Sequence, residues 1–447
     1  MPTQVSYPGV YIEEVPSGVR TISGVATSIA CFVGWAPQGP TDRAIRIGNF
    51  SDYTRHFGEI HPRSYLGYSV KQFFTNGGSD AYIIRVLEGS DSENEVATCS
   101  VGGLMFTASS PGEWAGGYGI SIKKKEAPGP VAFQLNVVAF ARKSDGSVDT
   151  STPVVVETFN NLSTNPDSPR YIKEVVNDDR SGSLYVRFVS GEDVDSAGST
   201  AFDGGSAKVP DDIDDPSNMH SSIKKLAEKE SVLDRIDLFN LLCVPGVTET
   251  ETLSELSTFC ERRRVMLLAD PDREMNQSNL TPPSVACRKN SAYFFPWVRA
   301  SDDLSEGRLT NFPPCGFMAG LFARTDATRG VWKAPAGTEA TLAGVNGPQH
   351  QLTDRENGIL NMKGINCIRN FPVYGTIAWG ARTLDGDDEI GSEWKYIPVR
   401  RTALFIEETL FRATKWAVFE PNDEPLWAQL RLNIGSFMND LFRQGAF

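Results

Sequence analysis

Two amphipathic helices predicted near the end of the chain constrain its fold most strongly. In the first, residues recur at steps of three and four, the period of one helix face: Ala403, Ile406, Leu410, Ala413 and Ala417. A break at Pro421–Pro425 separates it from a second helix with its own apolar face: Leu426, Leu430, Ile434, Phe437 and Leu441. An aromatic-rich strand region, residues 364–383, precedes both helices. We predict that the helices pack behind this strand as a core, in a domain spanning residues 364–447.

Strand and helix patterns alternate in two other parts of the chain. Continuous apolar runs predict buried strands at residues 29–35, 81–87, 236–244, 265–269 and 292–298. Helical faces lie between them, the first at Leu66, Val70 and Phe73 and the second at Leu253, Leu256 and Cys260. This order predicts parallel βαβ units. We therefore expect an α/β core built from residues 21–87 and 221–363, in a chain that is α+β overall.

The segment between these two parts, residues 88–220, has a different character. It is rich in Ser, Asp, Gly and Thr and carries short apolar runs at residues 131–140, 154–159 and 184–189. Short runs separated by turn residues are typical of antiparallel strands. The acidic run 211–216 closes the segment. We predict an antiparallel, β-rich domain inserted into the α/β core.

The first 20 residues predict an extended arm. Pro2, Pro8 and Pro16 exclude a helix. Apolar and aromatic residues lie between the prolines: Val5, Tyr7, Val10, Tyr11, Ile12 and Val15. A mobile terminus is the simpler interpretation, but this apolar content favours an arm that pairs with another chain.

Composition excludes several classes of function. The net charge of −13 and the isoelectric point near 5.0 argue against a surface for nucleic acid or anionic membrane. The sequence contains no apolar run of membrane-spanning length, and the polar start does not predict a signal peptide. The seven cysteines lack close pairs, which favours reduced thiols in a protein made in the cytoplasm.

Few residues suggest catalysis. Asp270 follows a predicted strand, where α/β enzymes place catalytic acids, and Asp272 is near enough to share a metal. Ordinary turn chemistry at Asp270-Pro271 explains the same residues. Phosphate-binding loops, a nucleophile elbow and a zinc-ligand set are absent from the sequence. We predict no catalytic, cofactor-binding or metal-ligating residues; the alternative is an α/β hydrolase or nucleotide-binding enzyme using Asp270.

Three separated blocks resemble contractile tail sheath proteins, a family that includes phage tails, R-type bacteriocins and extracellular injection systems. The blocks are Tyr7–Glu14, Ala323–Gly337, and Ile365–Arg369 with Trp379–Thr383. A further piece, Thr107–Gly117, is similar to the entrance of the family's outward-facing domain. The resemblance implies that residues 88–220 face outward and that residues 364–447 face an inner tube.

The resemblance also implies a function and partners. Many copies would wrap an inner tube as stacked rings and contract to drive it through a target envelope. Strand exchange through the N-terminal arm would join the copies, and the extended lattice would store the free energy. The implied partners are further copies, the tube protein, and baseplate and terminator or cap proteins, in a virion tail or an extracellular particle. Family members usually continue past residues 443–446 into a C-terminal arm. The resemblance therefore implies either a sheath protein without this arm or a chain that ends before it.

Basic residues of the last domain are candidate contacts to the tube or to a neighbour. Arg400 and Arg401 lie in the first helical turn, where the helix dipole disfavours cations. Arg431 and Arg443 lie on the polar side of the second helix. Solvated surface arginines explain these positions equally well; the alternative is a basic patch for carboxylates of a partner.

Overall fold

The computed structural model describes residues 21–87, 94–125, 132–142, 148–179, 181–192, 194, 197–210, 212–214 and 219–447. The predicted N-terminal arm, with Val5, Tyr7, Val10, Tyr11, Ile12 and Val15, lies outside these residues. The described helices are α1 (Phe50–Phe57), α2 (Leu66–Thr75), α3 (Ile172–Val176), α4 (His220–Leu226), α5 (Thr250–Arg263), α6 (Cys315–Arg329), α7 (Asp354–Met362), α8 (Ile397–Ala413) and α9 (Glu424–Arg443).

An eight-stranded sheet forms the centre of the body, in the order β18-β17-β13-β12-β11-β1-β3-β2. Its strands are β1 (Ala30–Gly34), β2 (Ile45–Ile47), β3 (Ala81–Arg85), β11 (Leu241–Cys243), β12 (Met266–Ala269), β13 (Ser291–Phe295), β17 (Ile365–Phe371) and β18 (Gly375–Ala378). The inner pairs are parallel, and only β2 and β18 at the two edges run antiparallel to their neighbours. The predicted α/β core is confirmed, although the strand expected at residues 236–244 is much shorter.

Helices cover both faces of this sheet, and each face has its own apolar core. Along β1, Ala30 and Phe32 join the core under α2 and α6, whereas Cys31 and Val33 join the core under α5. Side chains of successive strand residues point to opposite faces. A strand that is buried on both faces therefore needs an unbroken apolar run, which is the pattern of residues 29–35.

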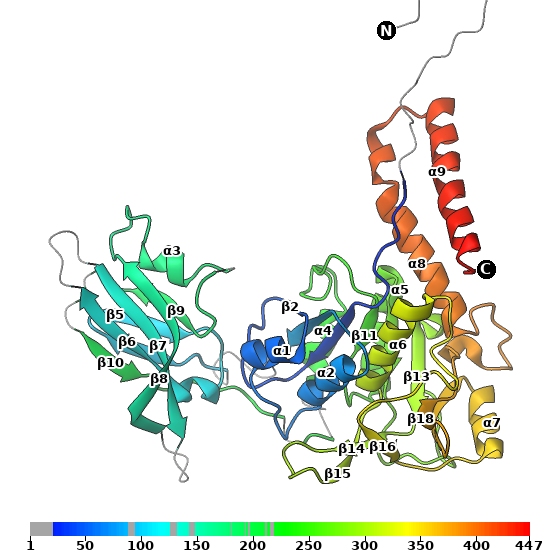
Figure 1. The fold of residues 1–447 in the computed structure, drawn as a ribbon, viewed down its shortest axis with the longest axis horizontal. Coiled ribbons are helices and arrows are strands. Elements are labelled where there is room, and N and C mark those ends of the chain that lie inside the picture. Colours follow the sequence, from blue (N-terminus) through cyan, green and yellow to red (C-terminus); the bar gives the residue numbers. More distant parts are fainter. Residues whose placement is uncertain are drawn as a thin grey trace, which may run out of the picture.

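Residues 94–206 contain a separate β-rich unit. Its strands are β4 (Thr98–Val101), β5 (Leu104–Ala108), β6 (Tyr118–Lys125), β7 (Ala132–Arg142), β8 (Val148–Leu162), β9 (Val186–Ser190) and β10 (Gly198–Ala201). They form two antiparallel sheets, β10-β6-β7-β8 and β4-β5-β9, around an apolar core whose residues all come from this unit. Figure 1 shows the unit standing beside the body. The predicted antiparallel strands are confirmed.

The last part of the chain differs from the prediction. A small sheet of β14 (Val298–Ser301), β15 (Leu309–Phe312) and β16 (Val345–Pro348) precedes it. Helices α8 and α9 then form a hairpin that projects away from the central sheet (Figure 1). Only the start of α8 enters the body core, at Ile397 and Leu404. The expectation that both helices pack as a core is therefore wrong for α9, which lies beyond the sheet that would have covered it.

Candidate functional site

The hairpin is fastened to the body by a buried ion pair at the start of α8. The guanidinium of Arg401 donates two hydrogen bonds to the carboxylate of Asp326 on α6, at 2.8 and 2.6 Å. Only 4% and 2% of these two side chains is exposed. Arg401 also donates to the backbone carbonyl of Thr27 at 2.9 Å and lies over the ring of Phe322. One residue therefore connects the hairpin, α6 and the chain segment that leads into β1.

Arg400 is buried in the same region. Its Nε donates to the side-chain oxygen of Asn290 at 2.8 Å, and its guanidinium lies 4.7 Å from the ring centre of Trp394. Arg400 and Arg401 are 5% and 4% exposed. The expectation that they form a surface patch for a partner is therefore corrected, because both guanidinium groups are enclosed by partners of their own chain.

The segment before β1 runs along α8 (Figure 1). The backbone N–H of Val25 donates to the Thr409 hydroxyl at 3.3 Å. Asn240 holds the same segment by donating to the carbonyl of Ala26 and accepting from the N–H of Ile29. A Cβ at Gly24 would lie 2.8 Å from the ring of Phe405, so a larger residue at this position would require the ring to shift. The segment that leads into β1 is thereby held along the hairpin.

An arginine cluster lies where α8 passes the end of α5. It comprises Arg235, Arg262, Arg263, Arg264, Arg412 and Lys415 with the carboxylates of Asp234, Asp237 and Glu408, and these residues line a hollow of about 540 Å³. Six cations against three carboxylates make the hollow positive, in a chain whose net charge is −13. The arginines that end α5 also lie at the negative end of the helix dipole, which stabilises them there.

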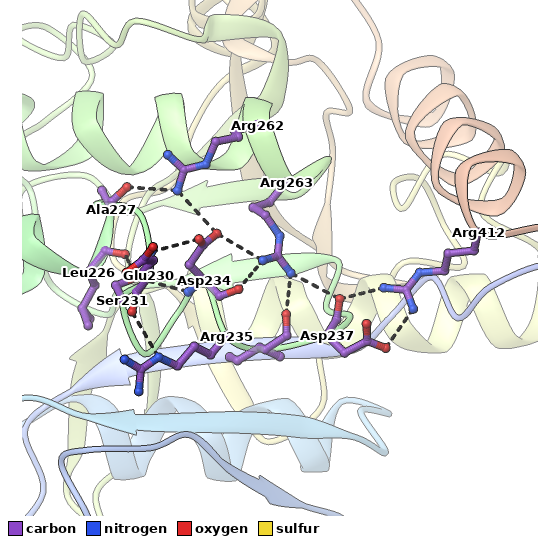
Figure 2. Close-up of polar contacts among 11 residues, drawn as sticks. Leu226, Ala227, Glu230, Ser231, Asp234, Arg235, Asp237, Arg262, Arg263 and Arg412 are labelled. Atoms are coloured by element: carbon purple, nitrogen blue, oxygen red, sulfur yellow. Dashed lines mark hydrogen bonds and ion pairs between the residues drawn. The ribbon is translucent and has the colours of Figure 1, made fainter. Parts of the chain in front are cut away.

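Figure 2 shows how this cluster fastens the loop before β11 to both helices. Arg263 donates to the backbone carbonyls of Asp234 and Ile236 and to the Asp234 carboxylate. Arg412 of α8 donates to the Asp237 carboxylate at 2.8 Å and to Glu408 at 2.6 Å. The hydrogen bond from Arg412 lowers the pKa of Asp237 below its ordinary value and in turn raises the pKa of Arg412. Both groups therefore stay charged across the neutral range.

Sequence reasoning did not select the arginines of this cluster. The available signal was the run Arg262-Arg263-Arg264 at the end of a predicted helix in an acidic chain. The two other predicted contacts, Arg431 and Arg443, are exposed on α9. Arg431 pairs with Glu424 at 2.6 Å, with more than half of each side chain exposed.

The hairpin exposes large apolar side chains. More than 45% of each of the following residues is exposed: Phe411, Val418, Phe419, Trp427, Leu432, Phe442 and Phe447. Exposed apolar side chains gathered on one part of the chain are candidates for contact with other molecules.

The motif residues of the last block hold the edge of the sheet together. Asn366 on β17 is fully buried. Its amide donates to the carbonyls of Tyr293 and Arg382, and its side-chain oxygen accepts from the N–H of Arg382 at 2.7 Å. Asn366 therefore joins the two pieces of the block, 365–369 and 379–383. Both pieces are needed for this structural contact, which explains why they occur together.

The burial and the hydrogen bonds of Asp270 indicate a structural role. It is 2% exposed and accepts hydrogen bonds from the backbone N–H of Cys315, which begins α6, and of Gly246. Burial raises the pKa of this carboxyl to about 6. Asp270 joins two loops at the end of the sheet. The thiol of Cys315 also hydrogen-bonds to its carboxylate, and burial raises the pKa of this thiol well above its ordinary value, so the thiol is not activated as a nucleophile.

The described residues contain no group of three or more His, Cys, Asp or Glu placed to hold a metal ion. Among the helices of these residues, none is long and apolar enough to cross a membrane.

Comparison of the sequence with known families gives a match in the second half of the chain. The family model for the phage tail sheath protein central domain matches residues 233–384. A putative prophage major tail sheath protein from Pseudomonas aeruginosa (strain UCBPP-PA14) is 26% identical over 226 residues, which cover 48% of this chain and 57% of the relative. The tail sheath protein of Vibrio phage KVP40 is 28% identical over 130 residues, or 29% of this chain and 19% of that protein. The chain thus spans less than two thirds of either curated relative.

Solved structures share the fold over nearly the whole chain. The helical sheath of the anti-feeding prophage in its contracted state is 22% identical, with a TM-score of 0.58, and covers 99% of this chain and 85% of that chain. A sheath tail protein from Listeria innocua is 12% identical, with a TM-score of 0.63, and covers 94% of this chain and 86% of that chain.

Proposed function

Since this chain carries the central domain and has the fold of tail sheath proteins, we propose that it is the structural subunit of a contractile tail sheath. Copies of the subunit wrap an inner tube and contract to drive it through a target envelope. The match of residues 233–384 to the sheath central domain carries this proposal. Two of the three sequence blocks that carry the family resemblance, at residues 323–337 and 364–383, lie inside that match and confirm the resemblance.

Several features support a role in assembly. The hairpin presents apolar side chains that the described part of the chain leaves uncovered, and the preceding segment runs out along the same hairpin. Further copies of the chain are the first partner we assign to these surfaces, with arm-to-sheet strand addition by residues 1–20 as the linkage. The inner tube, the baseplate and a terminator or cap are the further proposed partners, in a virion tail or an extracellular particle.

The proposed domains follow the sheets except at the last boundary. We propose residues 21–87 and 221–363 as the α/β core, residues 88–220 as the inserted outer domain, and residues 364–447 as the inner domain. The strands β17 and β18 of this last part nevertheless pair into the eight-stranded sheet of the core. The separate apolar core of residues 97–202 supports the insertion.

A structural role also accounts for the environment of Asp270, since both oxygens of its carboxylate accept backbone hydrogen bonds. The alternative of an α/β hydrolase therefore has no geometric support at this residue. We propose no cofactor.

The proposed contacts to the tube or a neighbour are now the exposed cations. Arg431 and Arg443 remain candidates, and the arginine cluster with its excess of positive charge joins them. Individual contacts of exposed charges contribute at most about 1 kcal/mol, but a ring of copies repeats each contact many times.

Electron microscopy of the purified full chain, alone and with its tube protein, tests the proposed function. We expect tubules or cylinders with a cogwheel cross-section. A variant lacking residues 1–20 is the matched control, because it should keep the melting transition of the body and lose the tubules. Monodisperse monomers from the full chain in the presence of the tube protein would contradict a sheath.

A further inference from the structure

A second hollow lies where the body meets the β-rich unit, far from the arginine cluster in sequence. Its volume is about 540 Å³, within the range of small-molecule sites. The body contributes residues after β1 and around the end of α1, and the β-rich unit contributes residues 112–118 and parts of β7. Sites for small molecules occur preferentially at such junctions between two units.

Aromatic rings form the walls of this hollow. On one side, Tyr118 and Tyr185 stack with their ring centres 4.8 Å apart, and Trp114 meets Tyr118 edge-on at 5.6 Å. On the other side, the ring of Trp35 is fixed because its indole N–H donates to the carbonyl of Lys208 at 3.0 Å. The faces of such rings are negative and attract cations.

The charges that line the hollow are acidic. Glu59 and Glu113 are both exposed at its edge, and no Lys or Arg is among the described residues that line it. His61 also lines the hollow, and burial lowers its pKa, so it is neutral at pH 7. Arg55 acts electrostatically on Tyr185 but does not line the hollow.

We propose that this junction hollow binds a small organic cation of the quaternary ammonium or alkylammonium class. The aromatic rings that line the hollow contact the cationic head, and the carboxylate of Glu59 compensates its charge from the edge. The Nε1–H of Trp114 is buried and has no hydrogen-bond partner among the residues that the structure describes. This N–H is available to donate to a hydroxyl or carbonyl oxygen carried by the same ligand.

The ligand would touch both units at once. A cation that binds the folded chain stabilises it by mass action, and here it would also hold the β-rich unit against the body. Binding at this hollow is independent of the proposed sheath function, since none of its lining residues belongs to the hairpin or to the arginine cluster.

Choline is the test ligand, and 3,3-dimethylbutan-1-ol, its neutral isostere, is the control. We expect choline to bind the full chain saturably by calorimetry, to change tryptophan fluorescence and to raise the melting temperature, with no such effects from the isostere. The variant Glu59→Gln should weaken choline binding roughly three- to fivefold, because one charge contact is lost. Tyr118→Leu should weaken it roughly two- to fivefold through one cation–π contact.

The variant Glu389→Gln removes the same charge from an exposed loop elsewhere and should bind choline like the parent. The variant at Glu59 changes an exposed side chain and should fold, so the test stands even if Tyr118→Leu does not fold. Equal binding of the neutral isostere, preferential binding of an uncharged sugar such as glucose, or absence of saturable choline binding would overturn the proposal.

Discussion

The two helices of the hairpin look alike in sequence and differ in the structure. Both have an apolar face at helical spacing. In α8 the first half is enclosed by the body, with Ile397, Arg400, Arg401 and Leu404 buried. In α9, a helix of 20 residues, only Asn433, Phe437 and Leu441 are buried. An apolar face therefore shows that a helix will be covered, but it does not distinguish the chain's own core from another molecule.

The anchored end of the hairpin should show the largest loss of stability. Arg401→Ala leaves the carboxylate of Asp326 buried without its cation, which we expect to cost about 3–5 kcal/mol of unfolding free energy. Chemical denaturation followed by circular dichroism measures the change. A loss below about 1 kcal/mol would show that the anchored end is no tighter than the free end.

A buried carboxyl group in the body should also give a pH dependence of stability. The pKa of Asp270 in the folded chain is about 6, above its ordinary value. Its contribution to stability is therefore complete below about pH 4 and is lost as the pH rises through about 6. Asp270→Asn removes this titration, so its stability relative to the parent should improve by roughly 3 kcal/mol between pH 4 and pH 7.

Melting curves of the parent and of Asp270→Asn across this pH range test the sign. Asp354→Asn, at a side chain that is 92% exposed, is the control and should follow the parent. Parallel curves for Asp270→Asn and the parent would contradict the assigned environment.

A substitution at the free end of the hairpin should lower the stability of that end alone. Phe437 is 6% exposed and packs near Phe405 of α8. We expect Phe437→Ala to lower the cost of local opening by roughly 2 kcal/mol. Hydrogen exchange should speed up in α9 and stay unchanged in β1 and β12. Faster exchange in the central strands as well would place the hairpin in one cooperative unit with the body.

The smallest effect is expected at the exposed ion pair of α9. Arg431→Ala removes a contact to Glu424 in which both side chains are largely solvated, and the melting transition should change by less than about 0.5 kcal/mol. As a proposed partner contact, the same substitution should still reduce the yield of tubules in electron microscopy. Unchanged tubules would remove Arg431 from the assembly surface.

The sequence predicts the body better than the hairpin for a physical reason. The runs at residues 29–35 and 265–269 are unbroken because both faces of those strands are buried, so a local pattern carries the information. The position of Arg401 depends on Asp326, which lies 75 residues away in the chain. The local spacing of apolar residues carries no information about a partner so far away in the chain.

The same limit applies to the candidate site. The helix-dipole argument identified Arg400 and Arg401 as unusual but assigned their partners to another molecule, whereas Asn290 and Asp326 supply them. The run Arg262–Arg264 was visible in the sequence, yet its significance depends on α8 passing beside it. In both cases, the role of the arginines depends on contacts between segments that are distant in the sequence.

The position of β1 has a mechanical consequence. The segment that runs along α8 continues directly into β1, which lies between β11 and β3 and is in parallel register with both. A tensile force on the chain ahead of residue 21 would first strain the short contacts to Thr409 and Asn240. It would then load β1 along its own axis, so that the hydrogen bonds on both of its sides resist in shear and must break together. The body thus bears a pull on this segment through a strand that is hydrogen-bonded on both sides.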